Sequence, residues 1–364
     1  MINQMAIPLA GYFDKIRILF LQKTLKNDTL KKIFCNRSLR LLSSFMVVTI
    51  FNLFFSLFFP LWVLLIGPII YGLPHIYSSI RYLHYSLADK NQKTVGVQAF
   101  NFLTSIFAGV SIIRLLSEVQ IIDGDFLSSS SNTLELLSFI ITFLGLAIIY
   151  RKSLTKVVFA LIFIIPFLLL AWLSPIWIMG VLVLLHNIIA FLYWIVAAKN
   201  SSEKKVAYFA TLIFIIISTL IFLGVFDSVY KLYTPASALA WADIDYSKLG
   251  KMIVPWSANY ITWFHSVVAY AFGQSLHYFV WMKAIPDQHH SHQVPTSFRQ
   301  CYQKLTLDFT KNQLMVIVLS LLVMILVWTF VKLPIARVIY FSLAAYHGYM
   351  EMAALALVTI KAEK

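Results

Sequence analysis

The chain has 364 residues, of which 60% are apolar and only 12% are charged. Soluble domains usually carry about 25% charged residues, so this composition excludes an ordinary soluble enzyme or binding domain. The formal net charge of +14 does not indicate nucleic acid binding, because the basic residues cluster in short segments between apolar runs, as in the cytoplasmic loops of membrane proteins. We therefore expect a protein surrounded by membrane lipids.

Residues 1–41 are predicted to form a basic N-terminal segment in the cytoplasm. Up to residue 40 the segment contains eight Lys or Arg against two Asp, with apolar residues between them. Such a segment could be a helix lying on an anionic inner leaflet, or it could only fix the orientation of the first span. The sequence leaves both interpretations open.

Residues 42–360 are predicted to form an all-α, polytopic transmembrane helix bundle. The apolar runs reach about 17–25 residues, the length that a helix needs to cross a bilayer. Basic loops alternate with acidic or mixed loops, so both termini are expected in the cytoplasm, with 361–364 as a short tail. We expect the location to be a bacterial inner (plasma) membrane. The predicted spans, about ten in number, are 42–59, 61–80, 97–117, 134–150, 156–173, 175–197, 206–226, 256–283, 313–331 and 334–360.

Four histidines fall inside these spans, each on a different one: His75, His186, His277 and His347. Their distances from the cytoplasmic ends of the spans differ by roughly 12 Å. Helix tilt can account for a difference of this size, so the four side chains can lie at the same depth in the membrane. Ionisable side chains inside a membrane usually face the bundle interior and mark a functional site, and imidazole is a common ligand of Fe, Cu, Ni and Zn. The sequence therefore predicts a metal site formed by these four side chains.

Glu351 is an acidic residue well inside a predicted span. It follows His347 by four residues, so the two side chains share one face of a helix. We expect Glu351 to be catalytic: it could hold the imidazole of His347, ligate the metal or carry protons. The alternative is a buried ion-pair partner for Arg81 or Lys283.

The other histidines have simpler interpretations. His265 is near the outer end of its span and is expected to be structural, while His84 is expected to lie at the membrane interface. The segment with His289, His290 and His292 is flanked by prolines and lacks the HxxxH or HxxHH spacing of membrane hydroxylases and desaturases. We interpret it as a solvated loop, with metal binding as the alternative.

The sequence contains four short motifs in order: "GLPH" at 72–75, "VLLHN" ending at Asn187, "LHYFVW" at 276–281 and "YHGYME" at 346–351. Together they resemble motifs of the Brp/Blh family of membrane β-carotene 15,15'-dioxygenases. The resemblance implies non-haem Fe(II) held by histidines, with O₂ and a lipophilic substrate as partners, and oxidative cleavage of a carotenoid, as of β-carotene to retinal. We therefore expect an integral membrane, metal-dependent oxygenase.

The chain departs from this family at two positions. The family has an acid where this chain has Ser79, and a second histidine where it has Gly273. Four histidines would still leave up to two positions of an iron ion open for O₂ and substrate. The alternatives are a haem-binding membrane protein, with two of the histidines as axial ligands, and a non-enzymatic transporter, sensor or scaffold. The sequence gives no expectation for the oligomeric state.

Overall fold

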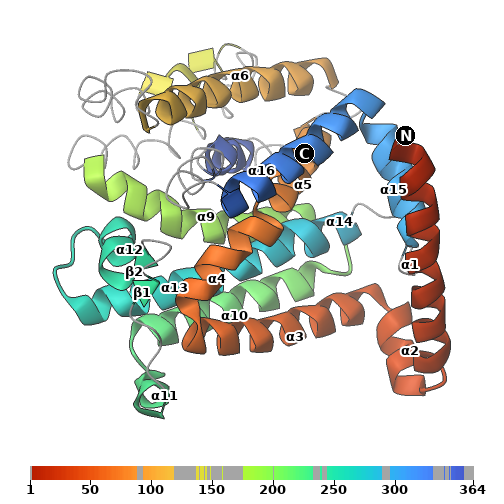
Figure 1. The fold of residues 1–364 in the computed structure, drawn as a ribbon, viewed down its shortest axis with the longest axis horizontal. Coiled ribbons are helices and arrows are strands. Elements are labelled where there is room, and N and C mark those ends of the chain that lie inside the picture. Colours follow the sequence, from red (N-terminus) through yellow and green to blue (C-terminus); the bar gives the residue numbers. More distant parts are fainter. Residues whose placement is uncertain are drawn as a thin grey trace.

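The described part of the chain is almost entirely helical (Figure 1), which confirms the predicted all-α class. The computed structural model describes residues 2–87, 93–118, 175–199, 201–232, 238–239, 244–288, 296–330 and 346–355, together with short stretches between 137 and 158 and residues 340 and 344. The elements are α1 (Ile2–Thr24), α2 (Asp28–Cys35), α3 (Arg37–Phe58), α4 (Pro60–Gly67), α5 (Leu73–Leu87), α6 (Lys93–Glu118), α9 (Pro175–Ala197), α10 (Lys204–Phe222), α11 (Asp227–Leu232), β1 (Ala238–Leu239), β2 (Ile244–Asp245), α12 (Tyr246–Ile253), α13 (Tyr260–Phe279), α14 (Ile285–Gln288), α15 (Phe298–Asp308) and α16 (Lys311–Phe330), with the π-helical turns η1 (Pro68–Gly72) and η3 (Val280–Ala284).

Helix α13 is the centre of the bundle. It contacts α3, α4, α9, α10 and α12, and in Figure 1 it runs alongside α3 and α10. Its side chains from His265 onward are largely buried. A buried amide fixes one of these contacts, because Asn52 Nδ2 on α3 donates to the carbonyl oxygen of Phe272 at 2.6 Å. A helix covered on several sides in this way can hold functional side chains away from the surroundings.

Several helices have the length and surface of membrane spans. Large apolar side chains point outward on α3 and α10, among them Ile50 and Leu212, which are 63% and 55% exposed. A surface of this kind marks contact with lipid or with another protein. The runs long and apolar enough to cross a membrane are Arg37–Phe58, Pro60–Ser86 and Lys204–Phe222, and shorter apolar helices cover Val97–Ile113 and Leu184–Ala197.

The predicted spans agree with these helices in position, although ten crossings are not shown. Spans 134–150 and 156–173 lie mostly outside the described residues, and span 334–360 is described chiefly at 346–355, where it is helical. Each of the other seven predicted spans overlaps a described helix. The helix of the first predicted span, α3, begins at Arg37 rather than at residue 42, because the Asn36 side chain caps it by accepting from Leu39 N at 3.1 Å.

The second apolar run is one helical rod with a local widening. Pro60 begins α4, where the missing amide hydrogen costs no hydrogen bond. Pro68 lies within the run, where it cannot donate to the preceding turn, and the chain continues as the π-helical turn η1 before α5. Such turns are frequent at functional sites, and this one precedes His75 directly.

A partly buried ion pair joins the start of α3 to the start of α10. Arg37 Nε and Glu203 Oε1 are 2.8 Å apart, and a second guanidinium nitrogen donates to Oε2 at 3.1 Å. Burial tends to raise the pKa of the Glu203 carboxyl, but hydrogen bonds from Arg37 and from neighbouring serines outweigh burial and lower the pKa to about 2. The pair therefore favours the charged carboxylate in the folded protein.

We expect this ion pair to make stability depend on pH in the acidic range. The folded-state pKa lies below the ordinary value near 4.5, so the contribution of Glu203 is present above about pH 4.5 and is lost as the pH falls toward 2. The substitution Glu203→Gln should destabilise the protein at pH 7 by about 2 kcal/mol, because it removes hydrogen bonds to a charged group, the Arg37 guanidinium, that is only partly buried. Thermal unfolding from pH 7 to pH 3 measures this difference, which should shrink below pH 4.5; a constant difference would contradict the assignment.

Candidate metal centre

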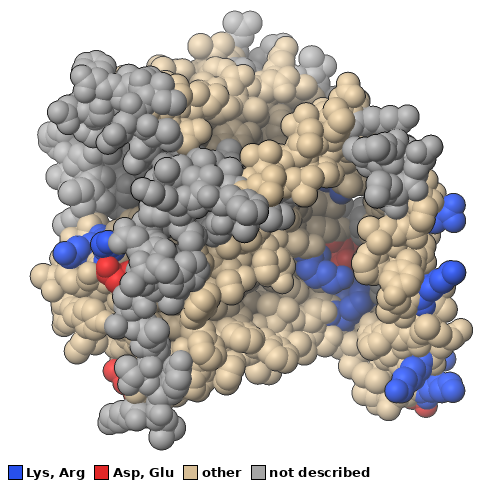
Figure 2. Space-filling model, viewed as in Figure 1, with Lys and Arg blue, Asp and Glu red and all other residues tan. Residues whose placement is uncertain are grey.

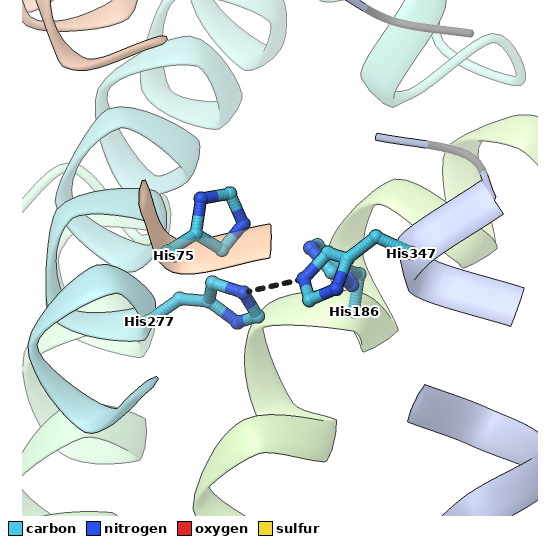
Figure 3. A group of neighbouring side chains, drawn as sticks. All are labelled: His75, His186, His277 and His347. Carbon is cyan, nitrogen blue, oxygen red and sulfur yellow. Dashed lines mark hydrogen bonds between the residues drawn. The ribbon is translucent and has the colours of Figure 1, made fainter. Parts of the chain in front are cut away.

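The structure brings together the four histidines that the sequence singles out, from four separate helical segments. His75 is on α5, His186 on α9, His277 on α13 and His347 on the helical segment 346–355. One potential ligand atom from each lies within 4.8 Å of those of the others, and Figure 3 shows the rings gathered in one place. His75, His277 and His347 are at most 1% exposed. Four imidazoles at this spacing, three of them buried and that of His186 partly buried, could hold one metal ion.

The π-helical turn η1 orients His75. The Nδ1 atom of His75 lies 3.0 Å from the carbonyl oxygen of Tyr71, one turn earlier. A carbonyl can only accept, so Nδ1 carries the proton and Nε2 is left with a free lone pair. This is the arrangement that a metal-ligating histidine requires. In the sequence, the feature that accompanies this π-helical turn is Pro68, because a proline disturbs the helix just before His75.

Ser79 performs the same role for His347. The Oγ atom of Ser79 donates its hydrogen to the carbonyl of Ile76 at 2.9 Å, and lies 2.6 Å from His347 Nδ1. Because the hydroxyl hydrogen is already used, Oγ accepts from Nδ1–H. The Nε2 atom of His347 is then unprotonated and faces His277 Nε2 at 3.5 Å. Ser79 therefore fixes the tautomer and the orientation of the His347 imidazole.

The carboxylate of Glu351 completes the cluster. Its Oε1 atom lies 2.8 Å from His347 Nε2 and 3.8 Å from His277 Nε2, and Oε2 lies 3.3 Å from His186 Nδ1. The residue is 0% exposed. Glu351 thus faces three imidazoles, and not Arg81 or Lys283, which pair instead with Asp308 and Asp287.

Several buried polar atoms of the cluster lack hydrogen bonds. Among the described residues, no partner is found for the Nδ1 atoms of His186 and His277 or for either oxygen of Glu351. A buried carboxylate without compensation is costly. A divalent cation between the rings would compensate the charge and use the free lone pairs, so this donor set fits a metal ion that prefers nitrogen and oxygen ligands.

A network of phenols lies against the other face of His75. The ring of Tyr278 packs on the imidazole of His75 with centroids 4.5 Å apart. Gln274 Nε2 donates to the hydroxyl oxygen of Tyr278 at 2.7 Å, and Tyr340 OH lies 3.0 Å from the same oxygen. Gly72 makes room for this network, because a Cβ there would lie 2.5 Å from the ring of Tyr340. Neither tyrosine stands out in the sequence as a candidate, since aromatic residues occur throughout the apolar runs.

An open cavity of about 580 Å³ adjoins this network. It lies between α3, α4 with η1, and α13 with η3, and its walls are largely apolar. Several lining side chains, including Trp62 and Ile66, are also exposed on the surface of the bundle, at 39% and 42%. Tyr71 and Tyr278 belong both to the cavity wall and to the contacts of His75. The cavity therefore extends from the outer surface of the bundle to side chains that contact His75.

The remaining sequence candidates lie outside the cluster or outside the described residues. His265 Nε2 is 2.8 Å from Asp227 Oδ1, consistent with a structural role. The rings of His84 and Phe100 are in contact, with centroids 5.0 Å apart. The segment of residues 289–292, which contains the other three histidines, is not among the described residues.

Gly273, where the resemblance would predict a further histidine, lies in close contact with the neighbouring helices α9 and α10. A Cβ at Gly273 would meet the Asn187 amide nitrogen at 3.0 Å and the ring of Phe214 at 3.4 Å. On α13, the residue that joins the described cluster is His277.

Comparisons with known proteins do not identify this chain: no family model, no curated protein and no solved structure matches it. The interpretation of the cluster therefore depends on its own geometry.

Proposed function

We propose that this chain is a multi-pass integral membrane oxygenase that binds non-haem Fe(II) through His75, His186, His277 and His347. The observation that carries the proposal is the convergence of four imidazoles and the buried Glu351 carboxylate. A ferrous ion in such a site would supply the redox chemistry for O₂. We further propose that the chain has about ten spans, that both termini are in the cytoplasm, and that it lies in a bacterial inner membrane. The positions of the basic loops support this topology.

The chain's own residues would perform three tasks. Tyr71 and Ser79 hold His75 and His347 in the tautomers that offer Nε2 to a metal. Glu351 balances the charge of the cation and can accept a proton from an imidazole or from a bound water. The buried position of the rings excludes bulk water from the reaction.

The cavity between α3, α4 and α13 would admit the substrate. Its apolar, aromatic lining and its opening on the outer surface favour a lipophilic molecule that enters sideways from the bilayer. Together with the four motifs, this favours oxidative cleavage or oxygenation of a carotenoid or a related lipid. Tyr278 lies between the cavity and His75, where it would orient the molecule.

The packing of the rings argues against haem. In five of the six pairs of these four histidines, the ring centroids are 4.2–5.7 Å apart. A macrocycle between any two of them would displace the other two. The same packing suits a single small ion.

Metal analysis of detergent-purified protein tests the proposal. Plasma mass spectrometry should find about one iron per chain in the wild type and in the control His265→Ala, and should find almost none in His186→Ala. Iron-loaded protein supplied with β-carotene and O₂ should then yield retinal-type products, detected by chromatography. Absence of metal from the wild type, metal unchanged in His186→Ala, or a haem absorbance band would each overturn the proposed site.

A further inference from the structure

Helix α1 carries an apolar stripe that stays largely exposed in the described structure, although its Phe13 and Phe20 contact Phe298 and Phe34 at the edges. Leu9, Tyr12, Phe13, Ile16, Leu19 and Phe20 are each at least 43% exposed. Their spacing by three and four residues places them on one side of a helix, since each residue turns the helix by about 100°. On another side, Ala10 is buried where α1 packs against α15.

Basic side chains border the stripe on both sides. Lys15 and Arg17 flank Ile16 in sequence, so they project about 100° to either side of the middle of the stripe. Lys23 and Lys26 follow in exposed positions at the end of α1. The first 36 residues contain six Lys or Arg against two Asp, and Figure 2 shows Lys and Arg gathered over α1 and α2.

The fold holds α1 across the ends of the spanning helices. Figure 1 shows α1 running across the direction of α3, α10 and α13, at the end of the bundle where α3 begins. The carboxylate of Asp14 fixes this position, because it accepts from the backbone nitrogens of Phe298 and Arg299 at the start of α15, at 2.8 and 3.1 Å. The rings of Phe13 and Phe298 also contact each other, with centroids 5.5 Å apart. A helix with this orientation lies parallel to the membrane plane if the others cross it.

We propose that α1 is an interfacial helix that binds the surface of an anionic lipid leaflet, with the Leu9–Phe20 stripe inserted and the basic side chains at the phosphate level. An apolar stripe bordered by Lys and Arg is the pattern of helices that lie in an interface. The long basic side chains can keep their charges in the headgroup region while their stems cover apolar surface. Anionic headgroups match the excess of positive charge. This inference does not depend on the metal site.

Spin labelling of the full chain tests the orientation of α1. In a variant with both natural cysteines, Cys35 and Cys301, replaced by serine, a label is placed at Ile16→Cys or at Gln22→Cys, about 120° further around the helix. The protein is reconstituted into nanodiscs with or without phosphatidylglycerol. In anionic discs the label at residue 16 should be more accessible to O₂ than to a nickel chelate, and the label at residue 22 should show the reverse.

Charge variants test the lipid partner. Lys15→Glu with Arg17→Glu should lower the O₂-to-nickel accessibility ratio at residue 16 at least about threefold in anionic discs. The control Lys248→Glu with Lys251→Glu on α12 changes the net charge equally and should leave the ratio unchanged. Greater access of nickel at residue 16 in both lipid compositions would overturn the proposal. Dipolar broadening between labels would overturn it in favour of a second copy of this chain on the stripe.

Discussion

Replacing Glu351 with glutamine is expected to weaken iron binding by about 10–100-fold and, at the same time, to make the iron-free protein more stable. The two effects have one cause. The Glu351 carboxylate is completely buried and, within the described structure, faces imidazole nitrogens of three histidines without a hydrogen-bond partner. Removing a carboxylate that supports metal ligands usually costs about one to two orders of magnitude in affinity. Without metal, the same negative charge is uncompensated and destabilising.

Thermal unfolding with and without iron separates these effects. With a chelator, Glu351→Gln should be more stable than the wild type by about 2 kcal/mol. With Fe(II) added under anaerobic conditions, the wild type should gain more stability than the variant, because stabilisation by a ligand follows its affinity. The matched control is Glu203→Gln, which removes a carboxylate paired with Arg37 and should destabilise the protein with or without iron. An equal loss of stability by Glu351→Gln in both conditions would show a purely structural role.

The histidine cluster could be predicted from the sequence because the membrane limits where ionisable residues occur. Each of the four histidines is an ionisable group in a predominantly apolar run, so its position along the helix gives its approximate depth. Similar depths on separate helices are the signal that the rings meet, and the structure places them within reach of one ion. Glu351 could be predicted for the same reason, from its spacing of four residues after His347.

The partners that orient these rings could not be predicted in the same way. Ser79 was one of several polar residues near the histidines, and only the packing of α5 against segment 346–355 selects it as the partner of His347. Ser78, its neighbour, donates to the carbonyl of Trp281 in η3 instead, at 2.5 Å. Gln274 contacts Tyr278 and not a histidine. Side chains one residue apart point about 100° apart on a helix, so an error of one position in register changes the partner.

For the fold too, the sequence predicts only a part: hydropathy indicates where the helices are, but the contacts in the structure determine how they pack and where their turns widen. Hydropathy located the helices well, because a long apolar run has few other stable structures. It could not reveal η1 and η3, whose widened turns lie three residues before His75 and three residues after His277. Nor could it show that α1 packs against α15, since these helices are almost three hundred residues apart and joined by the contacts of Asp14.

Filling the cavity with a larger side chain is expected to block catalysis without removing the metal. Ile66 lines the cavity wall on α4 and is 42% exposed, so Ile66→Trp should occupy the entrance while leaving the histidines untouched. Ile216 on α10 is 43% exposed and is not part of this cavity wall, which makes Ile216→Trp the matched control. A bulky lipophilic substrate would meet the new ring in the first variant only.

Formation of retinal-type products from β-carotene should fall at least about tenfold in Ile66→Trp, which corresponds to about 1.4 kcal/mol in the activation free energy. Iron content should equal that of the wild type in both variants, so that a loss of activity cannot come from a damaged metal site. The loss should be larger for a long polyene than for a shortened one, because the short molecule needs less of the cavity. Equal activity in both variants would exclude this cavity as the route to Tyr278 and His75, and would leave the metal site to be reached from another side of α13.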